Sequence, residues 1–271
     1  MNLDAYLQRI AYTGPRTPDA ATLAALHQAH LLAVPFENLD IHLGRPITLD
    51  LPSRYDKIVT RRRGGFCYEL NGLFAWLLRE MGYDVMLLSA GVYGGDGNPG
   101  PEYDHLTLLV RCPGDPTPWL ADVGFGEGFR EPLRLDVADE QTRNGRAYRI
   151  VPTPIHPPSP FPASPAGVSG GSVWRYFEQD REGAWKPRYW FTLTPREYPD
   201  FAEMCRWQQT SPDSHFTRNR VCSLATSQGR VTLADMTLIV TENGRRHETP
   251  IADDAAYQRL LRDRFGVDLT L

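Results

Sequence analysis

The chain has 271 residues, of which 41% are hydrophobic and 23% are charged, and its formal net charge is −4. This composition is typical of a globular protein with a substantial core, and the slight acidity argues against nucleic acid or an acidic membrane surface as a partner. The length suits one large domain or two to three small ones. Four cysteines without paired spacing predict free thiols in a reducing compartment.

Neither a secretion signal nor a membrane-spanning segment is expected from the sequence. The first residues lack a charged lead followed by an apolar core, so no signal peptide is expected. No apolar run approaches the ~18 residues that a membrane span needs. We therefore expect a cytoplasmic protein with no membrane partner.

Residues 1–84 are predicted to form a helical domain. Apolar side chains at helical spacing predict a short helix over residues 3–10. A second helix begins after Asp19 and is stopped by Pro35, with His27 and His30 on one side. These histidines could chelate a metal, but no third ligand is evident. Packing is therefore the favoured interpretation, and no metal site is predicted.

The helix predicted over residues 67–82 carries the most informative side chain, Cys67. Gly64 and Gly65 precede it and allow a sharp bend, and Gly82 is a plausible C-terminal cap. A thiol at the start of a helix feels the positive end of the helix dipole, which favours its thiolate. Cys67 is therefore a candidate nucleophile. The alternative is a small buried hydrophobe on the face formed by Leu70, Leu73, Phe74, Leu77, Leu78 and Met81.

From residue 85 to 197 the pattern changes to short β-like segments separated by Gly and Pro clusters, which predicts a small barrel or sandwich. His105 opens one segment, and Asp122 lies in the next, where a buried carboxylate needs a partner. A hairpin between the two segments would bring them together. Cys67, His105 and Asp122 then match a nucleophile, a base and an orienting carboxylate. The residues alone leave open that the three are unrelated structural positions.

The remaining chain is predicted to contain a surface loop and a third domain. Prolines and small polar residues over Thr153–Ser172 predict an extended surface loop that interrupts this β region. After residue 198 a helix is followed by two or three strands with an Asn243-Gly244 hairpin turn, and then by a final helix. We therefore expect an α+β chain with domains at 1–84, 85–197 and 198–271.

Several segments, in this order, resemble the arylamine N-acetyltransferases: LAALHQAHLLAVPFENLD, RGGFCYELN (Arg63–Asn71), DHLTLLV, LADVGFGEGFREPLRL and TSPDSHFTRN. The resemblance implies a helical first domain, a β-barrel middle domain and an α/β C-terminal lid. It also implies a papain-like cysteine site at Cys67, His105 and Asp122. One departure is that the family's asparagine in the interdomain helix is replaced around Cys205-Arg206.

The resemblance further implies a ping-pong reaction of xenobiotic metabolism. An acetyl group passes from acetyl-CoA, the donor substrate, through an acetyl-cysteine to an arylamine, arylhydrazine or N-hydroxyarylamine. The implied partners are coenzyme A and the small acceptor, with the enzyme a monomer or homodimer. An amide synthase or other acyltransferase of this fold, a cysteine hydrolase and a binding module with an inactive triad stay open. Matching positions border the acceptor pocket at Phe36, Tyr68, Val92 and Phe125 and brace the triad at Arg63 and Asn71.

Overall fold

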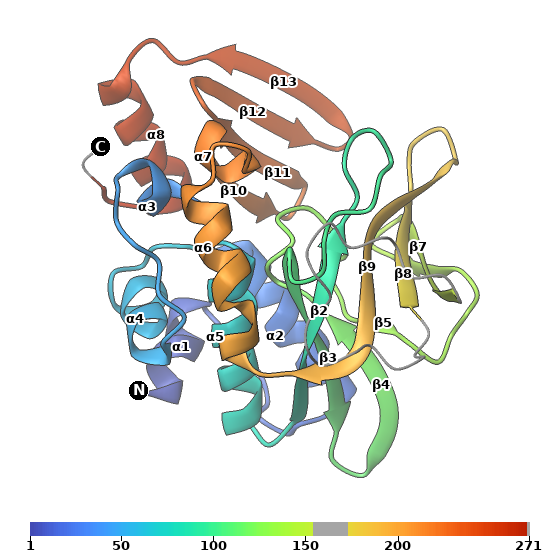
Figure 1. Ribbon diagram of the computed structural model, residues 1–271. Helices are drawn as coiled ribbons and strands as arrows, with labels where there is room; N and C mark the ends of the chain where they lie inside the picture. The colour runs from blue at the N-terminus through green and yellow to red at the C-terminus, as the bar shows by residue number, and fades with distance from the viewer. Residues whose placement is uncertain (154–172, 270–271) are drawn as a thin grey trace.

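The computed structural model describes residues 1–153 and 173–269. Figure 1 shows helices of the N-terminal part at the left, a barrel-like sheet at the right and a second sheet above them. The predicted surface loop Thr153–Ser172 lies outside the described residues except for Thr153, which ends a strand. None of the described helices is long and apolar enough to cross a membrane.

The N-terminal part is helical, as expected. Side-chain caps begin three of its helices. The carboxylate of Asp19 accepts a hydrogen bond from Thr22 N–H at 2.8 Å, the amide oxygen of Asn2 accepts one from Ala5 N–H at 3.0 Å, and the carboxylate of Asp50 accepts one from Ser53 N–H at 2.8 Å. Gly82 follows the helix that begins at Cys67, and its φ of +93° confirms the predicted cap. The elements are α1 (Leu3–Arg9), α2 (Ala20–Ala33), α3 (Leu39–His42), α4 (Leu51–Tyr55), the π-helix η1 (Asp56–Thr60) and α5 (Cys67–Glu80).

Gly64 has a different role from the one predicted. Neither Gly64 nor Gly65 has a positive φ, so the chain does not need glycine for a bend there. A Cβ atom on Gly64 would instead lie 1.9 Å from the carbonyl oxygen of Pro35. The segment before α5 therefore packs backbone to backbone against the segment that follows α2, and Glu37 N–H donates to the Gly65 carbonyl at 2.9 Å.

Among the described residues, the middle of the chain forms an eight-stranded, nearly closed barrel-like sheet in the order β5-β4-β3-β2-β9-β8-β7-β6. The predicted hairpin is present, because β3 and β4 pair antiparallel with Leu108 opposite Ala121. Leu106, Leu108 and Val110 of β3 pack in the helical core, whereas Leu109 packs inside the barrel. The strands are β2 (Asp84–Val92), β3 (His105–Cys112), β4 (Asp115–Ala121), β5 (Leu133–Arg134), β6 (Gln141–Arg143), β7 (Arg146–Thr153), β8 (Val173–Gln179) and β9 (Trp185–Arg196).

The C-terminal part forms the second sheet, and one of its strands comes from far away in the sequence. Strand β1 (Phe36–Glu37) pairs antiparallel with β10, so the sheet order is β1-β10-β11-β12-β13. We call the unit of β10 to β13 and α8 the lid. Its strands are β10 (Val221–Thr226), β11 (Gly229–Ala234), β12 (Thr237–Glu242) and β13 (Arg245–Pro250), and its helix is α8 (Asp254–Phe265). The connection from the barrel contains the 3-10 helix η2 (Tyr198–Phe201), α6 (Ala202–Thr210) and α7 (His215–Arg218).

Asn38 fastens the segment after β1 to the connection before β10. Its side-chain oxygen accepts from Val221 N–H at 2.8 Å, and its amide nitrogen donates to the carbonyls of Phe216 and Asn219 at 2.9 and 2.7 Å. Three hydrogen bonds of this buried side-chain amide are thus directed at residues 216–221. The N-terminal part and the lid are consequently joined by backbone pairing and by side-chain hydrogen bonds.

Candidate active site

Cys67 is the first residue of α5 and is only 2% exposed. The turn before it is stabilised by Glu69, whose carboxylate accepts from Phe66 N–H at 3.2 Å. The backbone N–H of Leu106 favours the ionised form of the sulfur. A Cβ atom on Gly124 would lie 2.8 Å from Cys67 Cα. The chain that follows β4 therefore lies directly against the start of α5, and only glycine fits there.

His105 and Asp122 are hydrogen-bonded, with His105 Nε2 and Asp122 Oδ2 at 2.7 Å. The other carboxylate oxygen accepts from Asn71 Nδ2 at 2.8 Å and from Gly124 N–H at 3.0 Å. Burial by itself would raise the pKa of Asp122. The ring of His105 and these two donors outweigh that effect and hold the pKa below its ordinary value. The carboxylate is therefore an anion that orients the imidazole.

Burial also raises the pKa of the Cys67 thiol well above its ordinary value. The Leu106 N–H lowers it, whereas the nearby carboxylates of Asp104 and Asp122 raise it. This opposes the expectation of a thiolate formed by the helix dipole alone. Ionisation of this sulfur requires that a neighbouring group take the proton.

Cys67 and His105 line one pocket of about 1590 Å³. Phe36, Val92 and Phe125, which were predicted to border an acceptor site, also line this pocket. Tyr68 does not line it. Its ring is fully buried and its hydroxyl donates to the carbonyl of Tyr103 at 2.8 Å, because the second residue of α5 points into the core rather than toward the opening.

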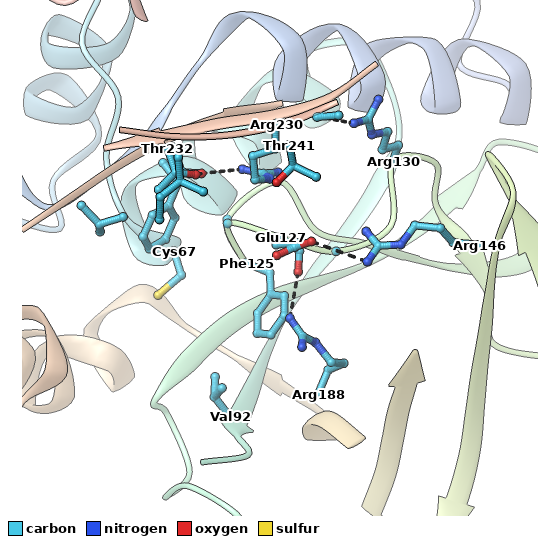
Figure 2. A pocket seen from close by; sticks show the side chains of 18 of the residues that line it. Cys67, Val92, Phe125, Glu127, Arg130, Arg146, Arg188, Arg230, Thr232 and Thr241 are labelled. Atoms are coloured by element: carbon cyan, nitrogen blue, oxygen red, sulfur yellow. Dashed lines mark hydrogen bonds and ion pairs between the residues drawn. The ribbon is translucent and has the colours of Figure 1, made fainter. Parts of the chain in front are cut away.

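The pocket extends from Cys67 to the lid, where its wall is rich in arginine. Figure 2 shows Glu127 between Arg146 and Arg188, with Arg130 and Arg230 beside the lid strands. Arg230 donates to Ser223 Oγ at 2.9 Å. Burial lowers the pKa of Arg230 to about 10, so it is still a cation at neutral pH. The pocket walls carry four carboxylates and seven arginines, namely Arg130, Arg146, Arg181, Arg188, Arg218, Arg230 and Arg246.

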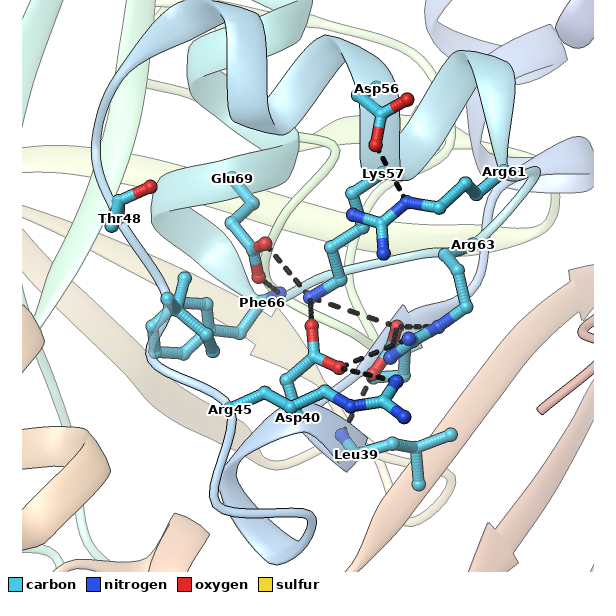
Figure 3. A network of polar contacts seen from close by, with 12 residues as sticks. Leu39, Asp40, Arg45, Thr48, Asp56, Lys57, Arg61, Arg63, Phe66 and Glu69 are labelled. Atoms are coloured by element: carbon cyan, nitrogen blue, oxygen red, sulfur yellow. Dashed lines mark hydrogen bonds and ion pairs between the residues drawn. The ribbon is translucent and has the colours of Figure 1, made fainter. Parts of the chain in front are cut away.

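The side chain of Arg63, which was predicted to brace the triad, pairs with carboxylates outside the triad. It binds Glu37 at 2.8 Å and Asp40 at 3.0 Å, within a buried network of charges (Figure 3). Lys57 joins this network through Asp40 and Glu69, both at 2.8 Å. Arg63 and Lys57 thus fix the chain that leads into α5. Of the two residues predicted to brace the triad, Asn71 hydrogen-bonds to Asp122 and Arg63 does not.

His27 is a residue of the site that sequence analysis assigned to packing. It is fully buried on α2, and its Nε2 accepts from the backbone N–H of Asp122 at 3.1 Å. No spacing signal in the sequence connects position 27 with position 122. Within residues 1–153 and 173–269, no group of three or more His, Cys, Asp or Glu side chains is placed to hold a metal ion.

Comparison with known proteins agrees with this architecture. Residues 19–271 match a family model described as N-acetyltransferase. The arylamine N-acetyltransferase of Mycolicibacterium smegmatis is 34% identical, covering 99% of this chain and 93% of that protein. A pineal gland isozyme of arylamine N-acetyltransferase from Gallus gallus is 31% identical, covering 99% of this chain and 95% of that protein.

Solved structures give the same result. The structure of Nocardia farcinica arylamine N-acetyltransferase matches with a TM-score of 0.86 at 34% identity, covering 100% of this chain and 90% of the other. Mycobacterium marinum arylamine N-acetyltransferase in complex with CoA matches with a TM-score of 0.84 at 32% identity, covering 98% and 93%. The fold and the family model define an N-acetyltransferase. More specifically, the chain belongs to the arylamine N-acetyltransferase family.

Proposed function

We propose that this protein transfers an acetyl group from acetyl-CoA to an arylamine, arylhydrazine or N-hydroxyarylamine by a ping-pong mechanism through acetyl-Cys67. The observation that carries the proposal is that Cys67 and His105 line one pocket while His105 is hydrogen-bonded to the anionic Asp122. Family membership supports the same activity, since the named relatives are arylamine N-acetyltransferases. Cys67, His105 and Asp122 are accordingly the proposed catalytic triad.

In the first half-reaction Cys67 attacks the thioester carbonyl carbon. His105 Nε2–H donates to Asp122, so Nδ1 is the ring nitrogen with a free lone pair. Nδ1 takes the thiol proton as the C–S bond forms, and Asp122 stabilises the resulting imidazolium. Backbone N–H groups at the start of α5 would stabilise the oxyanion. Coenzyme A leaves with the proton.

In the second half-reaction the acceptor amine attacks acetyl-Cys67. His105 takes a proton from the nitrogen as the new C–N bond forms, and returns it to the sulfur as the C–S bond breaks. Phe36, Val92 and Phe125 give the pocket an apolar wall next to Cys67 that suits an aromatic acceptor. The acetylated enzyme accumulates only if this wall keeps water away from the thioester.

The arginines at the lid end of the pocket suit the phosphate groups of the donor. Guanidinium groups bind phosphate through paired hydrogen bonds. Arg130 and Arg230 hydrogen-bond to neutral acceptors, which are backbone carbonyls and a serine hydroxyl respectively. Their charges are therefore available to an anionic ligand. We assign the phosphate-bearing part of coenzyme A to this end, with its thioester directed toward Cys67.

The first prediction is that acetyl-CoA alone adds one acetyl group to the protein, on Cys67. Intact-mass spectrometry should show this adduct in the parent protein and in Cys222→Ala, a matched change at another buried free cysteine. Cys67→Ala should show none. An adduct that persists in Cys67→Ala would exclude the proposed nucleophile. An adduct that decays quickly without an amine would indicate a hydrolase instead.

A further inference from the structure

Three consecutive backbone N–H groups after β4 each have a side-chain acceptor. Asp122 N–H donates to His27 Nε2 at 3.1 Å, Val123 N–H to Asn71 Oδ1 at 2.8 Å and Gly124 N–H to Asp122 Oδ1 at 3.0 Å. Strand β4 ends at Ala121, so these groups lie beyond the strand's own pairing. Two of the three acceptors come from helices α2 and α5. The segment that carries Asp122 is therefore fastened to both helices.

The hydrogen bonds of His27 define its proton position. Because Nε2 accepts from a peptide N–H, it carries no proton, and Nδ1 donates to the Arg130 carbonyl at 2.9 Å. Burial lowers the pKa of His27 to about 4, which keeps the ring neutral at physiological pH. The ring also stacks on Phe129, with centroids 5.6 Å apart and an interplanar angle of 15°. His27 is thus held in one orientation with both nitrogens used.

We propose that His27 is a positioning residue of the acetyl-transfer reaction, which fixes the backbone of Asp122 and so the direction in which its carboxylate meets His105. This rests on the proposed function, in which Asp122 orients the base. Without an acceptor at position 27, a buried peptide N–H would lack a partner and the segment would shift to find one. A shift of about 1 Å at a catalytic group can cost on the order of 100-fold in rate.

The test compares His27→Phe with His27→Gln. Phenylalanine keeps the ring shape and the stacking on Phe129 but removes both hydrogen bonds. Glutamine offers a side-chain oxygen that can accept from Asp122 N–H, and is the conservative variant. His30→Phe is the matched control, since His30 lies one turn away on α2, is equally buried and bonds to Tyr6 rather than to the Asp122 segment.

Two readouts separate positioning from general stability. Hydrogen exchange of the Asp122 amide should be faster in His27→Phe but unchanged in His30→Phe. The maximal rate of Cys67 acetylation should fall about 10- to 100-fold in His27→Phe, with the half-saturating acetyl-CoA concentration changed by less than about threefold. His27→Gln should recover most of the protection of the Asp122 amide and most of the maximal acetylation rate.

Equal acetylation by His27→Phe and the parent would overturn the proposal, as would equal losses in His27→Phe and His30→Phe. Should His27→Phe fail to fold, the amide exchange and acetylation rate of His27→Gln decide, because an unprotected Asp122 amide with an unchanged rate excludes a positioning role. A parent protein that never becomes acetylated refutes the proposed function instead. In that case the amide exchange still reports whether His27 fixes the Asp122 backbone.

Discussion

The carboxylate of Asp122 distinguishes between the two proton positions of His105. One of its oxygens faces two N–H donors, those of Asn71 and Gly124, and the other faces His105 Nε2. In Asp122→Asn the single amide oxygen would stay with the two donors, so the amide nitrogen would face His105. Nε2 would then have to accept, and the ring proton would move to Nδ1.

We therefore predict that Asp122→Asn lowers the rate of Cys67 acetylation on the order of 10³- to 10⁴-fold, since Nδ1 could no longer take the thiol proton. It should also reduce the free energy of unfolding by about 1–3 kcal/mol. Single-turnover acetylation and chemical denaturation measure the two effects. Asp104→Asn, which removes another pocket carboxylate without a hydrogen bond to the imidazole, should retain most of the rate. Equal rates in Asp122→Asn and the parent would refute the role of Asp122.

The lowered pKa of His27 predicts how the free energy of unfolding depends on pH. Its pKa is about 4 in the folded protein, against 6.5 for an ordinary histidine, because burial disfavours the cation. Between these values the unfolded chain binds a proton that the folded protein does not. Stability is therefore fully present above pH 6.5 and is lost as the pH falls toward 4.

For His27 alone the loss amounts to about 3 kcal/mol. Denaturation titrations at pH 7.5 and pH 4.5 should show a smaller difference in His27→Phe than in the parent protein. His30 contributes in the same direction, since burial lowers its pKa as well. An identical pH dependence in the parent and in His27→Phe would contradict this prediction.

The candidate triad could be selected from residue type and position. A cysteine opening an apolar helix, a histidine opening a strand and a carboxylate in the next strand together supply a nucleophile, a base and an orienting group. His27 could not be selected, because a neutral histidine on the apolar side of a helix resembles any core residue. Its function depends on the end of a strand 95 residues away. Tyr68 stays a prediction as a residue bordering the acceptor site. Its side chain does not line the pocket, because neighbouring positions of a helix point about 100° apart.

At the level of elements, strong local patterns were predicted well. The short helix near the N-terminus, α2, α5, α8 and the strands β3 and β4 have clear periodicity or caps, and all are present. Helices α3 and α4 have four and five residues, too few for a periodic signal. Strand β1 could not be predicted. It has two residues, and its partner in β10 lies at Cys222–Ser223, which no local pattern can indicate.

The buried charge network around Lys57 and Arg63 connects three elements, namely α3, η1 and the start of α5. Lys57 is buried among Glu37, Asp40 and Glu69, and these carboxylates raise its pKa despite its burial. Lys57→Met should reduce the free energy of unfolding by about 3–5 kcal/mol, since it leaves buried carboxylates without their cation.

Arg61→Gln is the matched control for this change. It breaks the ion pair between Arg61 and Asp56, two side chains that are each about half exposed. The free energy of unfolding should therefore fall by less than about 1 kcal/mol. Chemical denaturation near pH 7 measures both variants. Similar values for Lys57→Met and Arg61→Gln would show that the buried network is not a stabilising element.

For the whole molecule, the pocket between the barrel and the lid has an excess of positive charge. We predict that Arg230→Gln raises the half-saturating concentration of acetyl-CoA about 10- to 100-fold, because a charged hydrogen bond to phosphate is worth about 1.5–3 kcal/mol. Arg245→Gln, an exposed position on β13 outside the pocket wall, should have little effect.

Salt gives an independent check of the same assignment. The half-saturating donor concentration of the parent protein should rise with ionic strength, and that of Arg230→Gln should rise less steeply. The maximal rate of acetylation should change little in either case, since Arg230 is assigned to binding and not to chemistry. Identical salt dependence in both proteins would place the donor phosphates elsewhere.

The predicted division into residues 1–84, 85–197 and 198–271 stays a prediction, but the sheet that includes β1 qualifies it. Two residues of the first segment complete a sheet made by the third. Composition and periodicity can locate changes of pattern along a chain. They cannot reveal that a short strand has crossed such a boundary, because its pairing partner is fixed only by tertiary packing.

The pairing of β1 with β10, together with the three bonds of Asn38, has a practical consequence for engineering. In a hybrid enzyme made by grafting the C-terminal unit of a relative onto residues 1–197, β1 and Asn38 would face residues to which they are not matched. Its designer would have to transplant Phe36, Glu37 and Asn38 with the graft. Phe36 lines the pocket and Glu37 binds Arg63, so such a transplant would alter the pocket wall and the support of the chain that leads into α5 at once.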